Sequence, residues 1–126
     1  MYEHDTGHET LRIGASVSAG TSILSDLIST FKASHPDIQY LVHIENTQTI
    51  RQLILNNDLD IALIEVDITD PNLISECFAT AELVAVCSQK HPFYFKEEFT
   101  KEDLMHAAYI VRELGSNTRV LFDTAM

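Results

Sequence analysis

The chain has 126 residues, 45% hydrophobic and 21% charged, which is typical of one compact domain or a piece of a larger one. Nineteen acidic residues against eight basic ones give a formal charge of −11, and no basic cluster could neutralise phosphates, so we expect no direct DNA binding. The sequence offers no apolar run long enough to cross a bilayer and no secretory signal, which predicts a cytoplasmic protein.

Residues 1–10 show no hydrophobic periodicity and are predicted to form a tail or linker. His4, His8 and Glu9 suggest metal ligands at first sight, but their spacing lacks the glutamate that a metalloprotease helix carries beside its first histidine. Residues 11–15 are predicted to form a buried strand. A run of small residues at 16–20 then leads into a helix, since apolar side chains recur at helical spacing through residues 23–31.

The next segment continues the alternation of strands and helices. Residues 38–45 are predicted to form a second strand, and Asn46 or Thr47 is predicted to cap a second helix. Residues 59–66 form a nearly continuous apolar run, as expected of a strand in a parallel sheet. Acidic side chains surround this run and are interpreted as a solvated edge rather than a metal site. They are Asp58, Asp60, Glu65, Asp67 and Asp70.

Further strands are expected at residues 73–79, 82–88 and 109–112. Cys77 and Cys87 are predicted to be small buried residues on neighbouring strands. Thr100 should cap a short helix that reaches residue 106, and residues 115–118 should open a last helix. These elements predict an α/β protein with a tail at 1–10, a parallel βαβαβ lobe at 11–92, and a crossover with part of a second lobe at 93–126.

The candidate site lies at the edge of the sheet where the predicted strands end. In a right-handed parallel βαβαβ unit the strand carboxyl ends and the helix amino ends reach the same edge. Ser16, Val17 and Ser18 stand at the first junction and Thr47 at the second, so their hydroxyls and neighbouring free N–H groups should converge on one crevice. These donors and the helix dipoles suit a carboxylate, sulfate or phosphate without any lysine or arginine.

A third polar helix start, formed by Ser116, Asn117 and Thr118, could face the same crevice. The alternative is that these hydroxyls only cap their helices, which accounts for single residues equally well. Signatures of catalysis are missing from the sequence: residues 14–18 (GASVS) do not form a G-x-S-x-G elbow, and no glycine-rich phosphate loop occurs. We therefore expect no enzyme, no cofactor and no metal site.

Five segments carry a resemblance to a known family. They are residues 11–16 (LRIGAS), 31–36 (FKASHP), 45–50 (ENTQTI), 57–63 (NDLDIAL) and 111–119 (VRELGSNTR). In this order they resemble the effector-binding domain of LysR-type transcription regulators, a fold similar to type 2 periplasmic binding proteins. The resemblance covers residues 11–126, so the chain is expected to be a piece of a longer protein whose DNA-binding domain lies elsewhere.

The resemblance implies that the parent protein binds a small effector, expected to be anionic, between two lobes and thereby controls transcription. The positions that match the family's ligand contacts are Ser16, Ser18, Thr47 and residues 116–118. Ser18 where threonine is common, and Glu65 close to the crevice, leave the identity of the ligand open. The resemblance also implies self-association through the effector domain. Three alternatives stay open: a piece of a periplasmic-type solute-binding protein, a small hydrolase that uses Ser16, and an interaction module that binds no metabolite.

Overall fold

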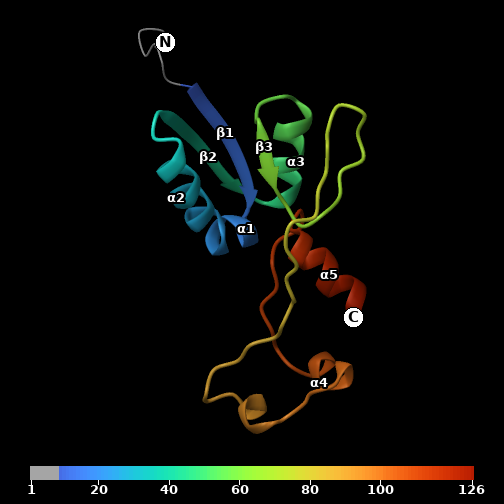
Figure 1. Ribbon diagram of the computed structural model, residues 1–126. Coiled ribbons are helices and arrows are strands. Elements are labelled where there is room, and N and C mark those ends of the chain that lie inside the picture. Colours follow the sequence, from blue (N-terminus) through green and yellow to red (C-terminus); the bar gives the residue numbers. More distant parts are fainter. Residues whose placement is uncertain (1–8) are drawn as a thin grey trace.

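A computed structural model of the chain describes residues 9–126. Its centre is a three-stranded sheet in the order β2-β1-β3, formed by β1 (Glu9–Ser16), β2 (Ile38–Glu45) and β3 (Ile61–Leu63). Both neighbours run parallel to β1, with β2 paired along the whole strand and β3 over three residues. The prediction of a parallel α/β unit is therefore confirmed (Figure 1).

The helices that connect the strands are α1 (Val17–Ser22), α2 (Leu24–Ser34) and α3 (Thr47–Leu55). The expected first helix is therefore two helices, which meet at Ile23. The expected tail is also too long by two residues, because Glu9 pairs with Ile38 in the sheet. His4 and His8 lie outside the described residues.

Helices cover both faces of the sheet because side chains alternate along β1. Ile13 and Ala15 pack with Leu24 of α2 and Leu63 of β3 in the main core cluster. The opposite face carries Gly14, where an added Cβ would lie 2.3 Å from a methyl group of Leu59 and 3.2 Å from Ile50 of α3. Glycine at this position thus lets α3 and the segment after it approach the strand closely.

The remainder of the chain contains η1 (Pro92–Phe95), α4 (Lys101–Met105) and α5 (Asn117–Ala125). The α4 helix begins as predicted, with Thr100 accepting from the Asp103 N–H while the Asp103 carboxylate accepts from the Thr100 N–H. Extended segments run from the sheet towards α4 and back to α5 (Figure 1). Within residues 9–126 the structure has no helix that is both long and apolar enough to span a membrane.

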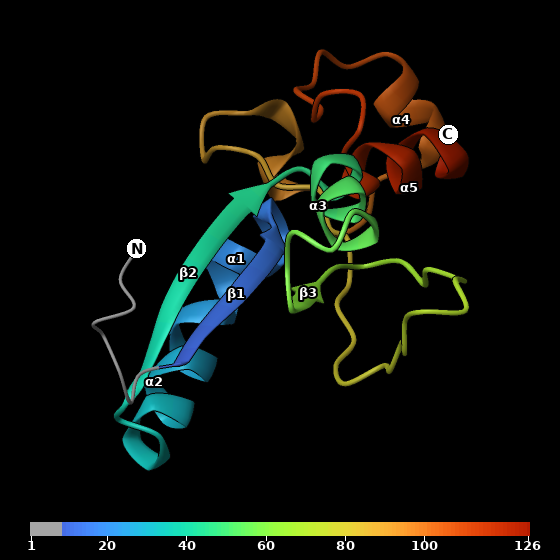
Figure 2. The same cartoon turned by 90° about the horizontal axis from the view of Figure 1, so that it is seen from above.

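The strands predicted at residues 73–79, 82–88 and 109–112 are wrong, because none of these segments pairs with a neighbouring strand in the described chain. A strand needs a hydrogen-bonding neighbour, and these segments find none among residues 9–126. The same correction applies to Cys77 and Cys87, which are exposed rather than buried. The third strand is also shorter than residues 59–66, since the chain bends away after Leu63 and forms the loop seen beside α3 in Figure 2.

Candidate functional site

The three strands point their carboxyl ends towards one edge of the sheet, near which α1 and α5 begin (Figure 1). Ser16 is the last residue of β1, Thr47 is the first residue of α3, and Glu65 lies two residues beyond β3. Ser16 and Thr47 are 2% and 7% exposed, whereas Glu65 is an exposed residue. The edge therefore presents buried hydroxyl groups beneath an exposed acidic side chain.

The carboxylate of Glu65 bridges the two hydroxyls. Ser16 Oγ donates to Glu65 Oε1 at 2.5 Å, and Thr47 Oγ1 donates to Glu65 Oε2 at 2.9 Å. Each carboxylate oxygen thus accepts from a different junction between a strand and a helix. Hydrogen bonds to an ionised acceptor are among the stronger ones in proteins, so this pair of donors can hold a carboxylate.

The capping interpretation holds for Ser16 but not for Thr47. Ser16 is the N-cap of α1, and its Oγ also accepts from the Ala19 N–H at 3.2 Å. In α3 the cap is Asn46, whose side chain accepts from the Thr49 N–H at 2.9 Å. The Thr47 hydroxyl therefore serves no cap, and among the described residues its hydrogen-bond partner is Glu65.

Two of the backbone N–H groups that were expected to be free at the start of α3 have partners within the chain. The Gln48 N–H donates to the Gly115 carbonyl at 3.2 Å, and the Thr49 N–H is used by the Asn46 cap. At the start of α5, the Arg119 N–H donates to Ser116 Oγ at 3.5 Å. These three N–H groups are therefore used within the chain and are not offered to a ligand.

The start of α5 lies against the starts of α1 and α3, as the sequence predicted. Ser18 Oγ and Thr118 Oγ1 are 3.4 Å apart, and Ser116, the N-cap of α5, is 2% exposed. Val17 and Asn117 are the first residues of α1 and α5, and both are half-buried. The structure thus gathers all seven predicted site residues around three helix starts, although their binding of a ligand stays a prediction.

Glycine is required in the turn that brings α5 to α3. Gly115 has a φ of +96°, a conformation that side chains other than glycine disfavour. A Cβ there would lie 2.9 Å from Gln48 Oε1 and 3.1 Å from Asn46 Nδ2. The close approach brings the Gly115 carbonyl within hydrogen-bonding distance of the Gln48 N–H, which donates to it.

Positive charge reaches the site from the extended segment before α5. Arg112 pairs with Glu113 at 2.7 Å, which lowers the pKa of Glu113 to about 2. The pKa of Arg112 is raised, mainly by its hydrogen bond to Glu113 and to a smaller extent by the charge of Glu65. Arg119 donates to the Arg112 carbonyl at 3.0 Å and so supports this segment from α5. The Arg112 guanidinium therefore lies within electrostatic range of Glu65.

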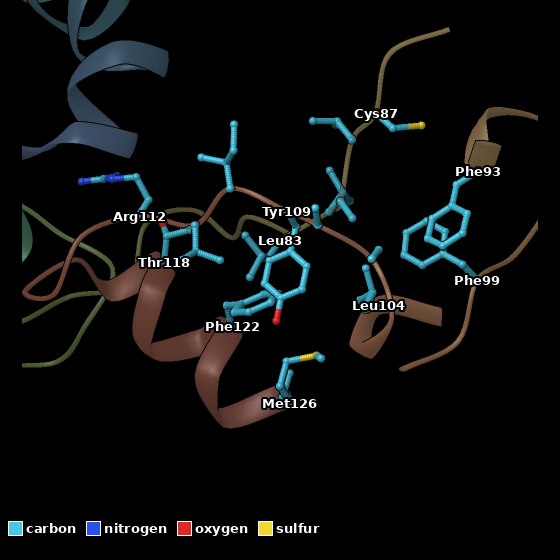
Figure 3. Close-up of a pocket in the computed structure, with 18 of the residues that line it drawn as sticks. Leu83, Cys87, Phe93, Phe99, Leu104, Tyr109, Arg112, Thr118, Phe122 and Met126 are labelled. Atoms are coloured by element: carbon cyan, nitrogen blue, oxygen red, sulfur yellow. The ribbon is translucent and has the colours of Figure 1, made fainter. Parts of the chain in front are cut away.

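A separate cavity of about 690 Å³ lies between residues 83–87, residues 107–112 and α5. Figure 3 shows Leu83, Tyr109 and Phe122 gathered in it, with Phe93 and Phe99 at one end. Its lining is mostly apolar, and Thr118 is the one predicted site residue among the side chains that line it. This cavity therefore adjoins the site at Thr118, but Ser16 and Thr47 do not line it.

Sequence reasoning placed Glu65 on a solvated acidic edge and close to the crevice, but it missed the bonds of this residue to Ser16 and Thr47. The available signal was its position, directly after the third strand and therefore at the same edge of a parallel sheet as Ser16. Asp60 was placed on the same edge and instead pairs with Arg12 at 2.9 Å. Within the described part of the chain, no three His, Cys, Asp or Glu side chains are arranged to hold a metal ion.

Residues 4–126 match the family model described as the LysR substrate binding domain. The chain belongs to this family. Similar proteins include a "Probable RuBisCO transcriptional regulator" from Trieres chinensis, 32% identical over 121 residues, which are 92% of this chain and 39% of the relative. Another of the same name, from Chlorokybus atmophyticus, is 32% identical over 120 residues, or 93% and 38% of the two chains. The "HTH-type transcriptional regulator CysL" of Bacillus subtilis is 31% identical over 113 residues, or 90% and 38%.

Membership of the LysR family confirms the resemblance seen in the sequence. The relatives are named as transcription regulators, so the family is one of regulators rather than of enzymes. The chain spans less than two fifths of the length of these relatives.

Proposed function

We propose that this LysR-family domain senses a small anionic effector at the edge formed by Ser16, Thr47 and the start of α5, and that the parent protein uses this binding to control transcription. The carboxylate of Glu65, held by the Ser16 and Thr47 hydroxyls, is the observation that supports it. Two oxygens of one anionic group fit these two donors, so a carboxylate, sulfate or phosphate group of an effector has matching chemistry.

The parent protein would have two lobes, with residues 11–92 in the first and residues 93–126 in the crossover and part of the second. The effector would lie where Ser18 of α1 faces Thr118 of α5, since these residues come from the two proposed lobes. DNA contact would come from a separate domain, because the −11 charge of this chain repels the polyanionic DNA backbone. We place the protein in the cytoplasm, where a transcription regulator acts.

Self-association belongs to the same proposal. Leu27 and Phe31 of α2 and Val42 and Ile44 of β2 are between 38% and 44% exposed. Phe31 contacts Tyr40 of β2 edge to face, so the exposed side chains of α2 and β2 form one apolar surface. Contiguous apolar surface of this kind is typical of contacts between subunits, and β2 is also an edge strand.

The test of the effector site is a comparison of two Thr→Val variants on one helix. Thr47→Val removes a buried hydroxyl that bonds the Glu65 carboxylate, whereas Thr49→Val makes the same change at an exposed position of α3. One hydrogen bond to a charged group is worth roughly 1.5 to 3 kcal/mol, or about a tenfold to hundredfold change in affinity. Binding of sulfate, phosphate and small carboxylates is measured by thermal shift and calorimetry.

We expect Thr47→Val and Ser16→Ala to weaken anion binding and Thr49→Val to leave it unchanged. A third variant, Asn46→Ala, separates binding from capping, since loss of this cap should lower stability by about 1 kcal/mol with or without an anion. Equal anion-dependent thermal shifts in the wild type and in the Ser16→Ala, Thr47→Val double variant would show that the proposed site is wrong.

A further inference from the structure

Glu65 differs from the other acidic side chains of its segment in the residues that it contacts. Asp60 pairs with Arg12, and Asp67 accepts from the Ser75 hydroxyl. Glu65 instead covers two hydroxyls that are themselves buried, one on β1 and one on α3. A negatively charged side chain therefore lies where the proposed effector would present its anionic group.

The geometry of this contact is that of a bidentate oxyanion. The two oxygens of Glu65 accept from different donors, Oε1 from Ser16 and Oε2 from Thr47. A ligand with two oxygens on one atom, such as a carboxylate, sulfate or phosphate, can take over both bonds with the same geometry. A monatomic anion such as chloride offers one acceptor atom in place of two and does not reproduce this geometry.

The Glu65 carboxylate can leave the hydroxyls without disrupting a helix or a strand. Glu65 is exposed and stands in the bend after β3, outside any helix or strand. Its charge also acts on Arg112, so a cation lies nearby when the carboxylate moves away from Ser16 and Thr47. Departure of Glu65 exposes two hydroxyls that stay in place, because Ser16 ends a paired strand and Thr47 begins a capped helix.

We propose that the Glu65 carboxylate is an internal competitor of the effector, which occupies the oxyanion position on Ser16 and Thr47 until an effector carboxylate, sulfate or phosphate group displaces it. This inference rests on the proposed function, because it assigns the occupant of the same site in the unliganded protein. Glu65 then determines specificity by two means. It excludes weakly bound anions, and it selects ligands with a bidentate oxyanion.

The experiment measures sulfate binding to four forms of the 126-residue chain, which are the wild type and the Glu65→Gln, Glu65→Ala and Glu76→Gln variants. Glu76 is an exposed carboxylate on the loop that follows β3, as Glu65 is, and no hydrogen bond joins it to Ser16 or Thr47, so its variant removes equal charge away from the hydroxyls. We expect both Glu65 variants to bind sulfate about tenfold more tightly or better, and Glu76→Gln to change the affinity by less than about twofold. Chloride should not reproduce the gain.

A second readout is the ¹³C chemical shift of the Glu65 carboxyl carbon, which should change when sulfate is added to the wild type. Weaker or equal sulfate binding by both Glu65 variants would overturn the inference. If Thr47→Val still loses binding in that case, the proposed function stands and only the role of Glu65 is wrong. If sulfate, phosphate and carboxylates saturate none of these proteins, both proposals are overturned.

Discussion

The turn at Gly115 offers the sharpest test of how the site is assembled, and the change to make is Gly115→Ala. Alanine at a φ of +96° should cost about 1 to 2 kcal/mol in backbone energy. Its Cβ would also lie 2.9 Å from Gln48 Oε1 and 3.1 Å from Asn46 Nδ2, so both amide side chains must shift. We therefore expect the free energy of unfolding to fall by about 1 to 3 kcal/mol.

The assay is urea denaturation combined with hydrogen exchange at the Gln48 amide. This amide donates to the Gly115 carbonyl, so displacement of the turn should speed its exchange. Leu114→Ala is the matched control, because Leu114 is 77% exposed in the same turn and its truncation should change stability by less than about 0.5 kcal/mol. A Gly115→Ala variant as stable as Leu114→Ala, with unchanged Gln48 protection, would refute the requirement for glycine.

Three further predictions concern the rest of the chain. Thr100→Ala should lower stability by about 1 kcal/mol through loss of the capping box, and an unchanged urea midpoint would contradict this. An NMR titration should find the pKa of Glu113 at about 2, and Arg112→Gln should return it towards 4.5. Because folding lowers this pKa, the ion pair stabilises the folded state above pH 4.5, and this stabilisation is lost as the pH falls towards 2. A Glu113 pKa that Arg112→Gln leaves unchanged would exclude the pairing. Val42→Asp should shift the self-associated chain towards monomer in light scattering, whereas a wild type that is monomeric at high concentration would refute the apolar α2 and β2 surface as an interface.

Local patterns were sufficient where an element depends mainly on its own residues. The second strand has the predicted bounds of 38–45, and Thr100 caps α4 as expected. Glycine and serine at 115–116 correctly marked the start of the last helix. These features follow from hydrophobic alternation and capping chemistry, which act over a few residues.

Patterns failed where an element needs a distant partner. Residues 82–88 and 109–112 have the apolar character of strands, but strand formation requires a neighbouring ladder, which they lack in the described chain. For the same reason Cys87 is exposed although its neighbours are apolar. Ile23 separates α1 from α2 although it continues the apolar spacing of the helix, so helical periodicity did not reveal the break.

The site shows the same division between local and tertiary information. The sequence alone determined the family, the parallel order of the first strands and the set of hydroxyls at their carboxyl ends, because topology sends those ends to one edge. Only the tertiary structure decided which residue caps α3, where the N–H groups of Gln48 and Thr49 are used, and that Glu65 bridges Ser16 and Thr47. Glu65 lies 49 positions after Ser16 and 18 positions after Thr47 along the chain. Side-chain contacts at such separations depend on how the backbone packs, which local sequence does not encode.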